Sequence, residues 1–180
     1  MGPLVPFPVK PGRQPAVRLL WCLIGAACGI ALALYVVGPT HHAFVLASLG
    51  GSTVFLFGLT RAPAAQLRAL LGGHLGTAAI GIACAQFLGN SLLAYVAAVT
   101  LALGFMLLTR TVHPPAGANP VIMVHAQASW SALLDPVLLG VACLIGVAAI
   151  WSRIYPELVH YPVSPWEPSP PSVNWGGWSN

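Results

Sequence analysis

Five long apolar runs dominate the amino-acid sequence and contain almost no charged side chains. They cover residues 17–37, 43–60, 69–89, 92–109 and 133–151. Each has about the 20 residues that a helix needs to cross the roughly 30 Å hydrocarbon core of a bilayer. Only 6% of the residues are charged, against about 25% in a soluble domain, so a water-facing surface cannot be built. The sequence therefore predicts an all-α membrane protein with about five transmembrane helices.

Basic residues predict how these spans are oriented. Those at the ends of the first four runs are, in order, Lys10, Arg13, Arg18, Arg61, Arg68 and Arg110. The connections 38–42 and 89–91 contain no Lys or Arg. Because cytoplasmic loops carry an excess of Lys and Arg, this pattern favours a cytoplasmic N-terminus. We expect a multi-pass protein of the bacterial inner membrane.

The segment between the fourth and fifth runs contains His113-Pro114-Pro115-Ala116-Gly117-Ala118-Asn119-Pro120. It is too rich in proline to continue a helix and too apolar for a solvated loop. A helix of about a dozen residues extends only about 18 Å, which is too short to cross. We therefore expect residues 112–128 to form a re-entrant hairpin that dips from the cytoplasmic side. If the segment crossed instead, Arg153 and the C-terminal tail would return to the cytoplasm.

This interpretation divides the chain into three parts. Residues 1–16 form a cytoplasmic proline-rich lead-in, residues 17–153 form the transmembrane domain, and residues 154–180 form an extracytoplasmic tail rich in Pro and Trp. Weak internal symmetry is also visible, since Leu-Thr-Arg closes both the second and the fourth run and proline follows each time. Internal repeats with interrupted helices are common in transporters.

Small residues interrupt the second run at Ala47-Ser48-Leu49-Gly50-Gly51-Ser52-Thr53. Paired glycines between hydroxyl side chains can unwind a helix locally, which predicts a broken helix that faces a site near the midplane. The alternative is close helix packing through small residues. The predicted substrate-binding residues from this stretch, the third run and the hairpin are Ser48, Gly50, Gly51, Ser52, Thr53, His74, His113, Pro114, Pro115, Gly117, Ala118 and Asn119.

The chemistry of these residues favours an anion or a small neutral polar solute. A helix that starts after Pro114-Pro115 would point N–H groups and a partial positive charge into the membrane, and the only acidic residue in any span is Asp135, near the start of the fifth. Arg61, Arg68 and Arg110 would concentrate anions at the cytoplasmic mouth. For His74 and His125 a bracing hydrogen bond is the alternative role, and His41-His42 is expected at the outer surface.

Other functions are less favoured by the sequence. The six histidines lack the spacing and the carboxylates of a zinc site, so neither a metal nor another cofactor is expected. Asp135 is the only acid before residue 157, and no nucleophile motif surrounds a serine, so an enzyme is not expected. Basic residues stand singly, which argues against nucleic acid. The four cysteines fall within apolar runs and are expected to pack as small hydrophobic residues.

These motifs carry a resemblance to a known family. Thr109-Arg110-Thr111-Val112-His113-Pro114-Pro115-Ala116-Gly117-Ala118 resembles the signature of the HPP family of integral membrane proteins. The stretches 47–52 and 55–58 resemble its small-residue segment, and Gly72-Gly73-His74 resembles the start of its next span. The resemblance covers about residues 17–153. It implies a membrane protein of few spans and, since nitrite transport is reported for some members, nitrite as the leading substrate.

The sequence thus supports two hypotheses. The first is a small-anion transporter or channel, with nitrite as the substrate and the broken helix and the hairpin as the site. Five spans make a thin protein, so a homo-oligomer in the lipid bilayer is expected. The alternative is a non-transporting scaffold or sensor in which the hairpin is structural. Proton coupling, the identity of the anion and the choice between channel and carrier stay open.

Overall fold

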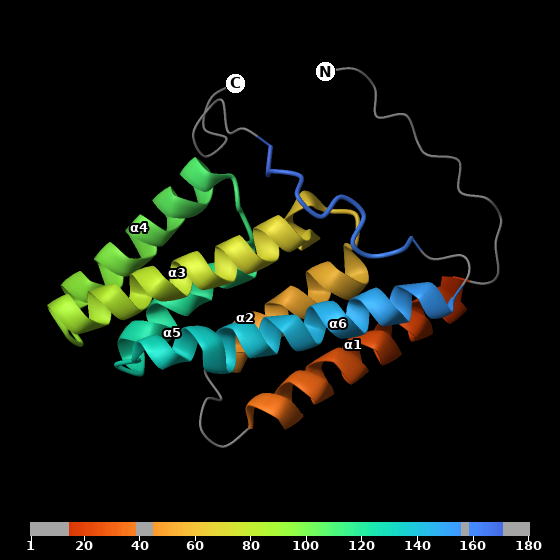
Figure 1. Cartoon of the computed structure of the whole chain (residues 1–180), viewed down its shortest axis with the longest axis horizontal. Coiled ribbons are helices and arrows are strands. Elements are labelled where there is room, and N and C mark those ends of the chain that lie inside the picture. Colours follow the sequence, from red (N-terminus) through yellow and green to blue (C-terminus); the bar gives the residue numbers. More distant parts are fainter. Residues whose placement is uncertain (1–14, 39–44, 156–158, 171–180) are drawn as a thin grey trace.

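The computed structural model describes residues 15–38, 45–155 and 159–170 (Figure 1). The elements are α1 (Pro15–Val37), α2 (Val45–Thr53) with the π-helical turn η1 (Val54–Gly58), the short 3-10 turn η2 (Pro63–Ala65), α3 (Leu67–Leu88), α4 (Leu92–Thr109), the 3-10 turn η3 (Pro114–Ala118) with α5 (Asn119–His125), and the turns η4 (Trp130–Leu133) and η5 (Leu134–Leu138) that lead into α6 (Leu139–Ile154). The described residues form helices and turns without a strand. The predicted all-α class is therefore correct.

Four described helices are long and apolar enough to cross a membrane. They are Ala16–Val37, Leu67–Leu88, Leu92–Thr109 and Trp130–Ile154. Of the predicted span at 43–60 the structure describes residues 45–60, and within them the apolar helix covers Ala47–Gly58. At 1.5 Å per residue such a helix extends only about 18 Å, roughly three fifths of the hydrocarbon core. Within the described part of the chain there are therefore four long helices and a shorter apolar one, where the sequence predicts five spans.

Two short helical segments pack against each other between the longer helices. One is α2 with η1, and the other is η3 with α5 (Figure 1). They touch at Gly51, where a Cβ atom would lie 2.9 Å from Cβ of Pro115. The longer helices surround them, with α1 and α6 packed on one side and α3 and α4 on the other. The fold thus encloses two interrupted helical segments within a frame of longer ones.

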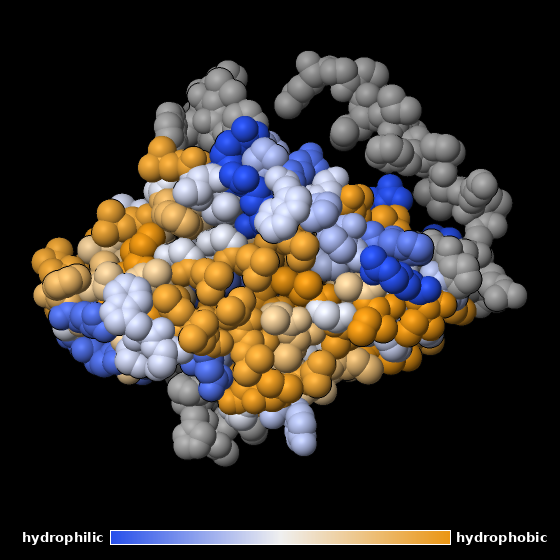
Figure 2. Space-filling view, in the orientation of Figure 1, coloured by the Kyte–Doolittle hydropathy of each residue, from blue (hydrophilic) through white to orange (hydrophobic). Residues whose placement is uncertain are grey.

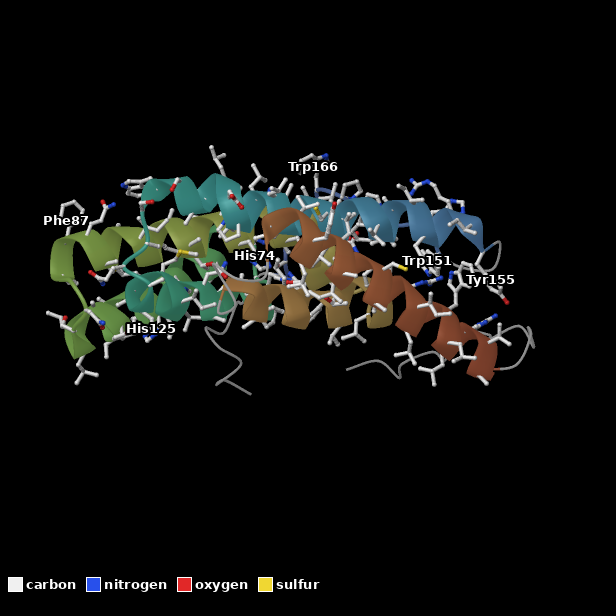
Figure 3. All side chains as sticks on the ribbon, turned by 90° about the horizontal axis from the view of Figure 1, so that it is seen from below. His74, Phe87, His125, Trp151, Tyr155 and Trp166 are labelled. Carbon is white, nitrogen blue, oxygen red and sulfur yellow. The ribbon has the colours of Figure 1, made fainter. Side chains whose placement is uncertain are left out.

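The segment that follows α4 does not form the predicted re-entrant hairpin. It starts beside the N-terminal end of α3, where the Arg68 guanidinium donates to the carbonyl of Thr109 at 2.9 Å. It ends beside the C-terminal end of α3, where the Trp130 indole donates to Oε1 of Gln86 at 3.0 Å. Figure 3 likewise shows His125 at the same end as Phe87, far from Tyr155. The segment therefore runs along α3 from one end to the other.

The predicted hairpin is wrong because the sequence argument estimated the length of this segment as if all of it were α-helix. The structure adds an extended stretch, 110–113, and a 3-10 turn before the seven residues of α5. Extended and 3-10 backbone rise about 3.3 Å and 2.0 Å per residue, more than the 1.5 Å of an α-helix. A segment with few α-helical residues can therefore cover more distance than the sequence argument allowed.

The C-terminal tail lies on the face that carries the arginines. Described tail residues 159–170 bind the loop between η1 and α3, since the Tyr161 hydroxyl donates to the Ala65 carbonyl at 2.9 Å and the Gln66 side chain accepts from the Val163 amide at 3.0 Å. The tail also pairs with Arg110, whose Nε donates to the carbonyl of Ser169 at 2.8 Å. The prediction that the tail lies opposite the arginines is wrong.

All described arginines consequently gather at one end of the helices, which we call the arginine face: Arg18, Arg61, Arg68, Arg110 and Arg153. The N-terminal end of α1 reaches this face beside the C-terminal end of α6, as the bond from the Trp151 indole to the Trp21 carbonyl demonstrates. Lys10, Arg13 and His41-His42 lie outside the described residues. Figure 2 shows an apolar surface over the middle of the molecule, with hydrophilic residues towards the ends of the helices and along the tail.

Candidate functional site

Five polar side chains are buried together where the two short segments meet α3. We call them the histidine cluster: Ser52 from α2, His74 and Thr77 from α3, His113 before η3, and Asn119 at the start of α5. Each is at most 1% exposed. Burying polar groups among apolar helices is costly unless they are hydrogen-bonded, and ionisable side chains at membrane depth are functional candidates by default. The cluster is therefore the candidate site.

Glycines on α3 bring the chain around His113 close to the helix. A Cβ at Gly73 would lie 3.0 Å from Cβ of His113 and 3.1 Å from the Thr111 carbonyl, and a Cβ at Gly81 would lie 2.8 Å from Cα of Pro120. Gly73, Thr77 and Gly81 follow one another at intervals of four residues, so they share one face of α3. Such a stripe of small residues allows close backbone approach.

His113 has a defined tautomer. Its Nδ1 lies 2.6 Å from the carbonyl oxygen of Ala64, and a carbonyl can only accept, so Nδ1 carries the hydrogen. In the neutral ring Nε2 is then an acceptor. That atom lies 2.8 Å from Oγ of Ser52, so the Ser52 hydroxyl donates to His113. The phenylalanine ring of Phe55 packs edge-on against this imidazole at 5.4 Å between centroids.

The tautomer of His74 follows from that of His113. The Ser52 hydroxyl has a single hydrogen, which it gives to His113, so it accepts from Nε2 of His74 at 2.8 Å. Nδ1 of His74 then accepts from the Asn119 amide nitrogen at 3.1 Å. Ser52 also lies 2.9 Å from the Ser48 carbonyl, but donating there would leave buried Nε2 of His113 without a donor.

Asn119 is left with one unsatisfied atom. Its Nδ2 lies 3.1 Å from Nδ1 of His74, 3.1 Å from the His74 carbonyl and 3.3 Å from the Thr77 hydroxyl. These three acceptors fix which end of the amide is nitrogen. Oδ1 is buried and has no hydrogen-bond partner. A buried acceptor without a donor is uncommon in proteins and marks a position where a donor can bind.

The cluster extends from the arginine face to the middle of α3. Ala64 belongs to the loop at that face, and Thr77 stands ten residues into α3, which is about 15 Å along the helix. Figure 3 shows His74 midway between the end marked by Phe87 and the end marked by Trp151. Thr77 continues the network to η3, because its hydroxyl lies 2.9 Å from the Ala116 carbonyl.

The structure brings together some of the predicted site residues and separates others. Ser52, His74, His113 and Asn119 are in the cluster, and Gly51 packs on Pro115 beside it. Ser48 is buried one turn before Ser52. The remaining predicted residues lie away from the hydrogen-bonded atoms: Gly50, Pro114 and Ala118 are exposed, Gly117 is half-buried, and Thr53 donates to the Leu49 carbonyl of its own helix.

Two features of the predicted anion site are not found. Gly50 and Gly51 lie within continuous helix, and the irregular backbone is instead the turn η1, which begins three residues after Gly51. The helical start at Pro114-Pro115 offers no amide hydrogen, because proline has none, and the Ala116 amide donates to the His113 carbonyl at 3.0 Å. The polar groups of the site are therefore side chains rather than backbone N–H groups.

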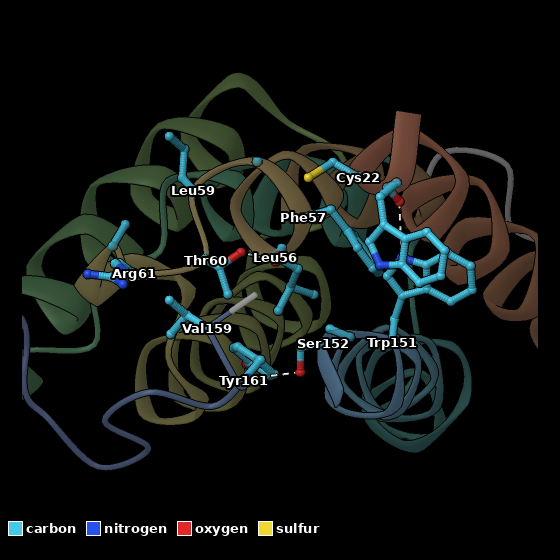
Figure 4. A pocket seen from close by; sticks show the side chains of 14 residues that line it. Cys22, Leu56, Phe57, Leu59, Thr60, Arg61, Trp151, Ser152, Val159 and Tyr161 are labelled. Atoms are coloured by element: carbon cyan, nitrogen blue, oxygen red, sulfur yellow. Dashed lines mark hydrogen bonds between the residues drawn. The ribbon is translucent and has the colours of Figure 1, made fainter. Parts of the chain in front are cut away.

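The predicted arginine funnel is partly engaged in structural bonds. Arg68 and Arg110 donate to the carbonyls of Thr109 and Ser169, and Arg110 also ends α4 in the left-handed conformation with φ of 55°. Arg61 is exposed and lines a cavity of about 440 Å³ at the arginine face. Figure 4 shows Trp151 on one side of this cavity and Arg61 on the other.

Two cavities lie among the described residues near the histidine cluster, and no side chain of the cluster lines either of them. The cavity of about 440 Å³ is bounded by α1, η1, α6 and the tail, and most of its lining is apolar. The second, of about 320 Å³, lies between α4 and η3 and includes Pro114 and Gly117 in an apolar lining. The cluster is closed in this conformation. The described residues contain no group of three or more metal-ligating side chains placed to hold a metal ion.

Sequence reasoning missed Thr77 and the residues that fix the loop of Ala64. Thr77 could have been found from its spacing between Gly73 and Gly81. Gln66 and Tyr161 hold the loop through bonds to residues about 100 positions away in the chain, and no local pattern reveals such a pairing. Burial raises the pKa of the Tyr161 phenol far above its usual value, so its hydroxyl keeps the proton that it donates to Ala65.

The fold and the cluster define a multi-pass helical membrane protein with a buried histidine site between two short helical segments. The sequence matches the model of the HPP transmembrane region over residues 11–162. The chain belongs to this family, and the resemblance of its His-Pro-Pro motif is thereby confirmed.

Its curated relatives include two transmembrane proteins of Dictyostelium discoideum. The chain is 30% identical to one over 169 residues, which cover 87% of this chain and 54% of the relative. It is 30% identical to the other over 114 residues, covering 59% and 40% respectively. The chain thus spans about half the length of these relatives or less. No solved structure matches the chain.

Proposed function

We propose that the protein transports a small inorganic anion across a membrane, with nitrite as the first candidate. The observation that carries this proposal is the histidine cluster, in which two imidazoles, two hydroxyls and an amide are buried at membrane depth. Polar side chains in such positions are expensive and commonly mark a solute pathway. Family membership adds support by analogy, and a shared fold does not define a substrate.

The closed cluster implies that transport requires a second conformation. Its hydrogen-bond donors are engaged internally, so an anion binds only when some of these bonds open. The junction of α2 with η3 is the natural place, because it is held by the contact of Gly51 with Pro115 and by the bond of Ser52 to His113. Separating the two segments would free the Ser52 hydroxyl, the His74 N–H and the Asn119 amide for the anion. Movement of one packed segment past another is a known form of alternating access.

A scaffold or sensor is the second candidate function, and a specific observation favours it. Most polar atoms of the cluster are already paired, and the two described cavities lie elsewhere. A fully satisfied polar network can serve to rigidify a fold. This function predicts that small anions neither cross the membrane through the protein nor change its stability.

The proposal also includes the orientation of the protein in its membrane and its assembly with other copies. The arginine face would be cytoplasmic by the positive-inside rule, in a bacterial inner membrane. Large apolar side chains on α1 and α4 are exposed, among them Leu23, Leu93 and Leu101. Lipid would cover part of these surfaces, and a second copy of the chain in a homo-oligomer would cover another part.

Anion uptake into proteoliposomes tests the proposal. Purified protein is reconstituted, and nitrite, nitrate and formate uptake are compared with protein-free vesicles. His113→Ala should abolish protein-dependent uptake, whereas His125→Ala, which changes an exposed histidine at the end of α5, should retain it. Both variants must elute as folded protein in detergent. Absence of uptake for every anion with well-folded wild-type protein would favour the scaffold function.

A further inference from the structure

Four hydrogen bonds in and beside the histidine cluster form a chain that points in one direction. The Asn119 amide donates to Nδ1 of His74, Nε2–H of His74 donates to Ser52, Ser52 donates to Nε2 of His113, and Nδ1–H of His113 donates to the Ala64 carbonyl. Each ring accepts at one nitrogen and donates from the other. This is the arrangement in which a proton added at one end can release a different proton at the other.

We propose that His74, Ser52 and His113 form a proton relay between the middle of the membrane and the arginine face. This inference extends the proposed function, because it makes the protein a proton-coupled anion transporter. The bonds of the relay are short, 2.8 Å at both contacts of Ser52 and 2.6 Å at Ala64. Its imidazole rings lie 5.1 Å apart between centroids, with the single hydroxyl of Ser52 bonded to both.

The transfer conserves protons at every step. An incoming proton forms an N–H bond at Nδ1 of His74, and the Nε2–H bond of that ring breaks. The released proton binds Oγ of Ser52, which gives its own hydrogen to Nε2 of His113. When the bond to the Ala64 carbonyl opens, His113 releases the hydrogen of Nδ1 to a water molecule at the arginine face, where the N–H bond breaks and an O–H bond of hydronium forms. One proton enters, one leaves, and both imidazoles end neutral.

The Ala64 carbonyl returns the relay to its starting state. After a transfer His113 carries its hydrogen on Nε2, and its bare Nδ1 faces a carbonyl oxygen 2.6 Å away. Two acceptors in contact repel each other. The hydrogen bond between His113 and Ala64 forms again only when Nδ1 of His113 carries a hydrogen, either by binding a new proton or by return of the ring to its first tautomer. Ala64 itself is half-buried in the loop at the arginine face, so a released proton has a short distance to travel.

Asn119 controls proton entry at His74, the end of the relay that lies in the middle of the membrane. Its amide nitrogen occupies Nδ1 of His74 and cannot supply a proton, so the relay is blocked while this bond exists. Its Oδ1 is a buried acceptor without a partner. A solute that carries a hydrogen-bond donor, such as water or the protonated form of the anion, can bind Oδ1 and draw the amide away from His74. Proton entry would then require that the solute be present.

The surrounding elements leave the relay isolated from other titratable groups. On α3, Cys84 packs against Ala94, Ala98 and Val124. His125 and Asp135, at the end of α5 and in η5, are exposed. Arg68 is bonded to Thr109, Tyr161 to Ala65, and Cys143 packs with the core of α1 and α6. Arg68, Tyr161, Cys84 and Cys143 thus have their contacts outside the relay.

The test measures protons and anion in the same vesicles. Protein is reconstituted with a pH-sensitive dye inside, and nitrite uptake and internal acidification are followed together at neutral pH against protein-free vesicles. Two variants break the relay: Ser52→Ala removes the linking hydroxyl, and His113→Gln keeps polar groups but cannot exchange a proton between two nitrogens. Thr60→Val is the matched control, because it removes a hydroxyl that donates to the Leu56 carbonyl outside the cluster.

We expect wild type and Thr60→Val to acidify the vesicles as nitrite enters. Both relay variants should lose about tenfold or more of this proton movement while remaining folded in detergent. Nitrite uptake without protein-dependent acidification in wild type would overturn the relay and leave anion transport intact. So would unchanged acidification in Ser52→Ala and His113→Gln.

A failure of the transport proposal is distinguished by a second measurement. If no anion moves, protons are driven alone by a potassium diffusion potential in the same vesicles. Proton flux in wild type that is lost in Ser52→Ala would support the relay without anion transport. Absence of protein-dependent flux under this potential would overturn it.

Discussion

Gly51 of α2 and Pro115 of η3 touch so closely that a single added carbon on Gly51 would lie 2.9 Å from Cβ of the proline. Proline is a rigid ring and cannot rotate away from such a contact. The contact holds Ser52 beside His113, because each of these residues is close in sequence to one of the touching pair. The distance between Ser52 and His113 therefore depends on position 51 being a glycine, which has no Cβ atom.

Replacing Gly51 by Ala should destabilise the protein, although alanine favours helices. Relieving the contact requires the two segments to separate, and such overpacking costs about 1–3 kcal/mol. Gly50→Ala is the matched control, because a Cβ there meets nothing within 4 Å and alanine should stabilise the helix by about 0.5–1 kcal/mol. Thermal unfolding in detergent should lower the Tm for Gly51→Ala and maintain or raise it for Gly50→Ala. Equal Tm values for the two variants would contradict this packing.

Asn119→Ala should be strongly destabilising. The amide nitrogen of Asn119 has three acceptors, and its loss leaves Nδ1 and the carbonyl of His74 without this donor. A buried polar group that loses its partner costs about 1–3 kcal/mol. The control is Asn90→Ala in the exposed connection between α3 and α4. Unfolding followed by intrinsic fluorescence in detergent measures both, and a smaller effect at position 119 than at position 90 would contradict the proposed network.

Gln66 should act as the attachment point of the C-terminal tail. Its Nε2 donates to the carbonyls of Thr60 and Ala62, and its Oε1 accepts from the amides of Val163 and Ser164. Gln66→Leu removes all four bonds while keeping a side chain of similar size, so the tail should be held less tightly, through its remaining bonds to Ala65 and Arg110. Limited proteolysis should then cleave after residue 155 faster than in wild type. Gln127→Leu, at an exposed glutamine, should leave the cleavage rate unchanged, and protection of the tail in Gln66→Leu would refute this attachment.

The sequence predicts the long helices of this structure better than the hydrogen bonds of its candidate site. The long spans were predicted because hydrophobic length is a local property, and α1, α3 and α4 begin and end close to the expected residues. Ser52, His74, His113 and Asn119 were selected because polar residues are rare in such surroundings. Their mutual bonds join residues 22 to 61 positions apart, and no local pattern encodes these pairings.

The errors in prediction have a physical origin as well. The path of 110–125 was misjudged because length was estimated for an α-helix only, although its first part is extended. The tail was assigned to the wrong side as a direct consequence. The expected unwinding at Gly50-Gly51 did not occur, since close packing on Pro115, which was the alternative, gives Gly51 a reason to be small within a regular helix. Thr77 is not predicted from the sequence, because a threonine among small residues has no distinctive local composition.

Placement of tail residues 159–170 on the same side as Arg61 is the prediction that most directly tests the path of residues 110–125. Residues 110–125 run from the arginine face to the opposite end of α3, and α6 returns. Tail residue Glu167 should therefore share a side with Arg61, and Asn90 should be on the other. In a background without the four native cysteines, Arg61→Cys, Glu167→Cys and Asn90→Cys provide exposed labelling sites.

A membrane-impermeant maleimide applied to intact cells, and then to inverted vesicles, separates the two possible paths. Glu167→Cys and Arg61→Cys should react together in one preparation, and Asn90→Cys in the other. If the positive-inside rule holds, the pair reacts in inverted vesicles. Reaction of Glu167→Cys together with Asn90→Cys would restore the re-entrant hairpin. It would also remove the path along α3 that positions His113 and Asn119 on either side of His74, so this labelling tests the architecture on which the proton relay depends.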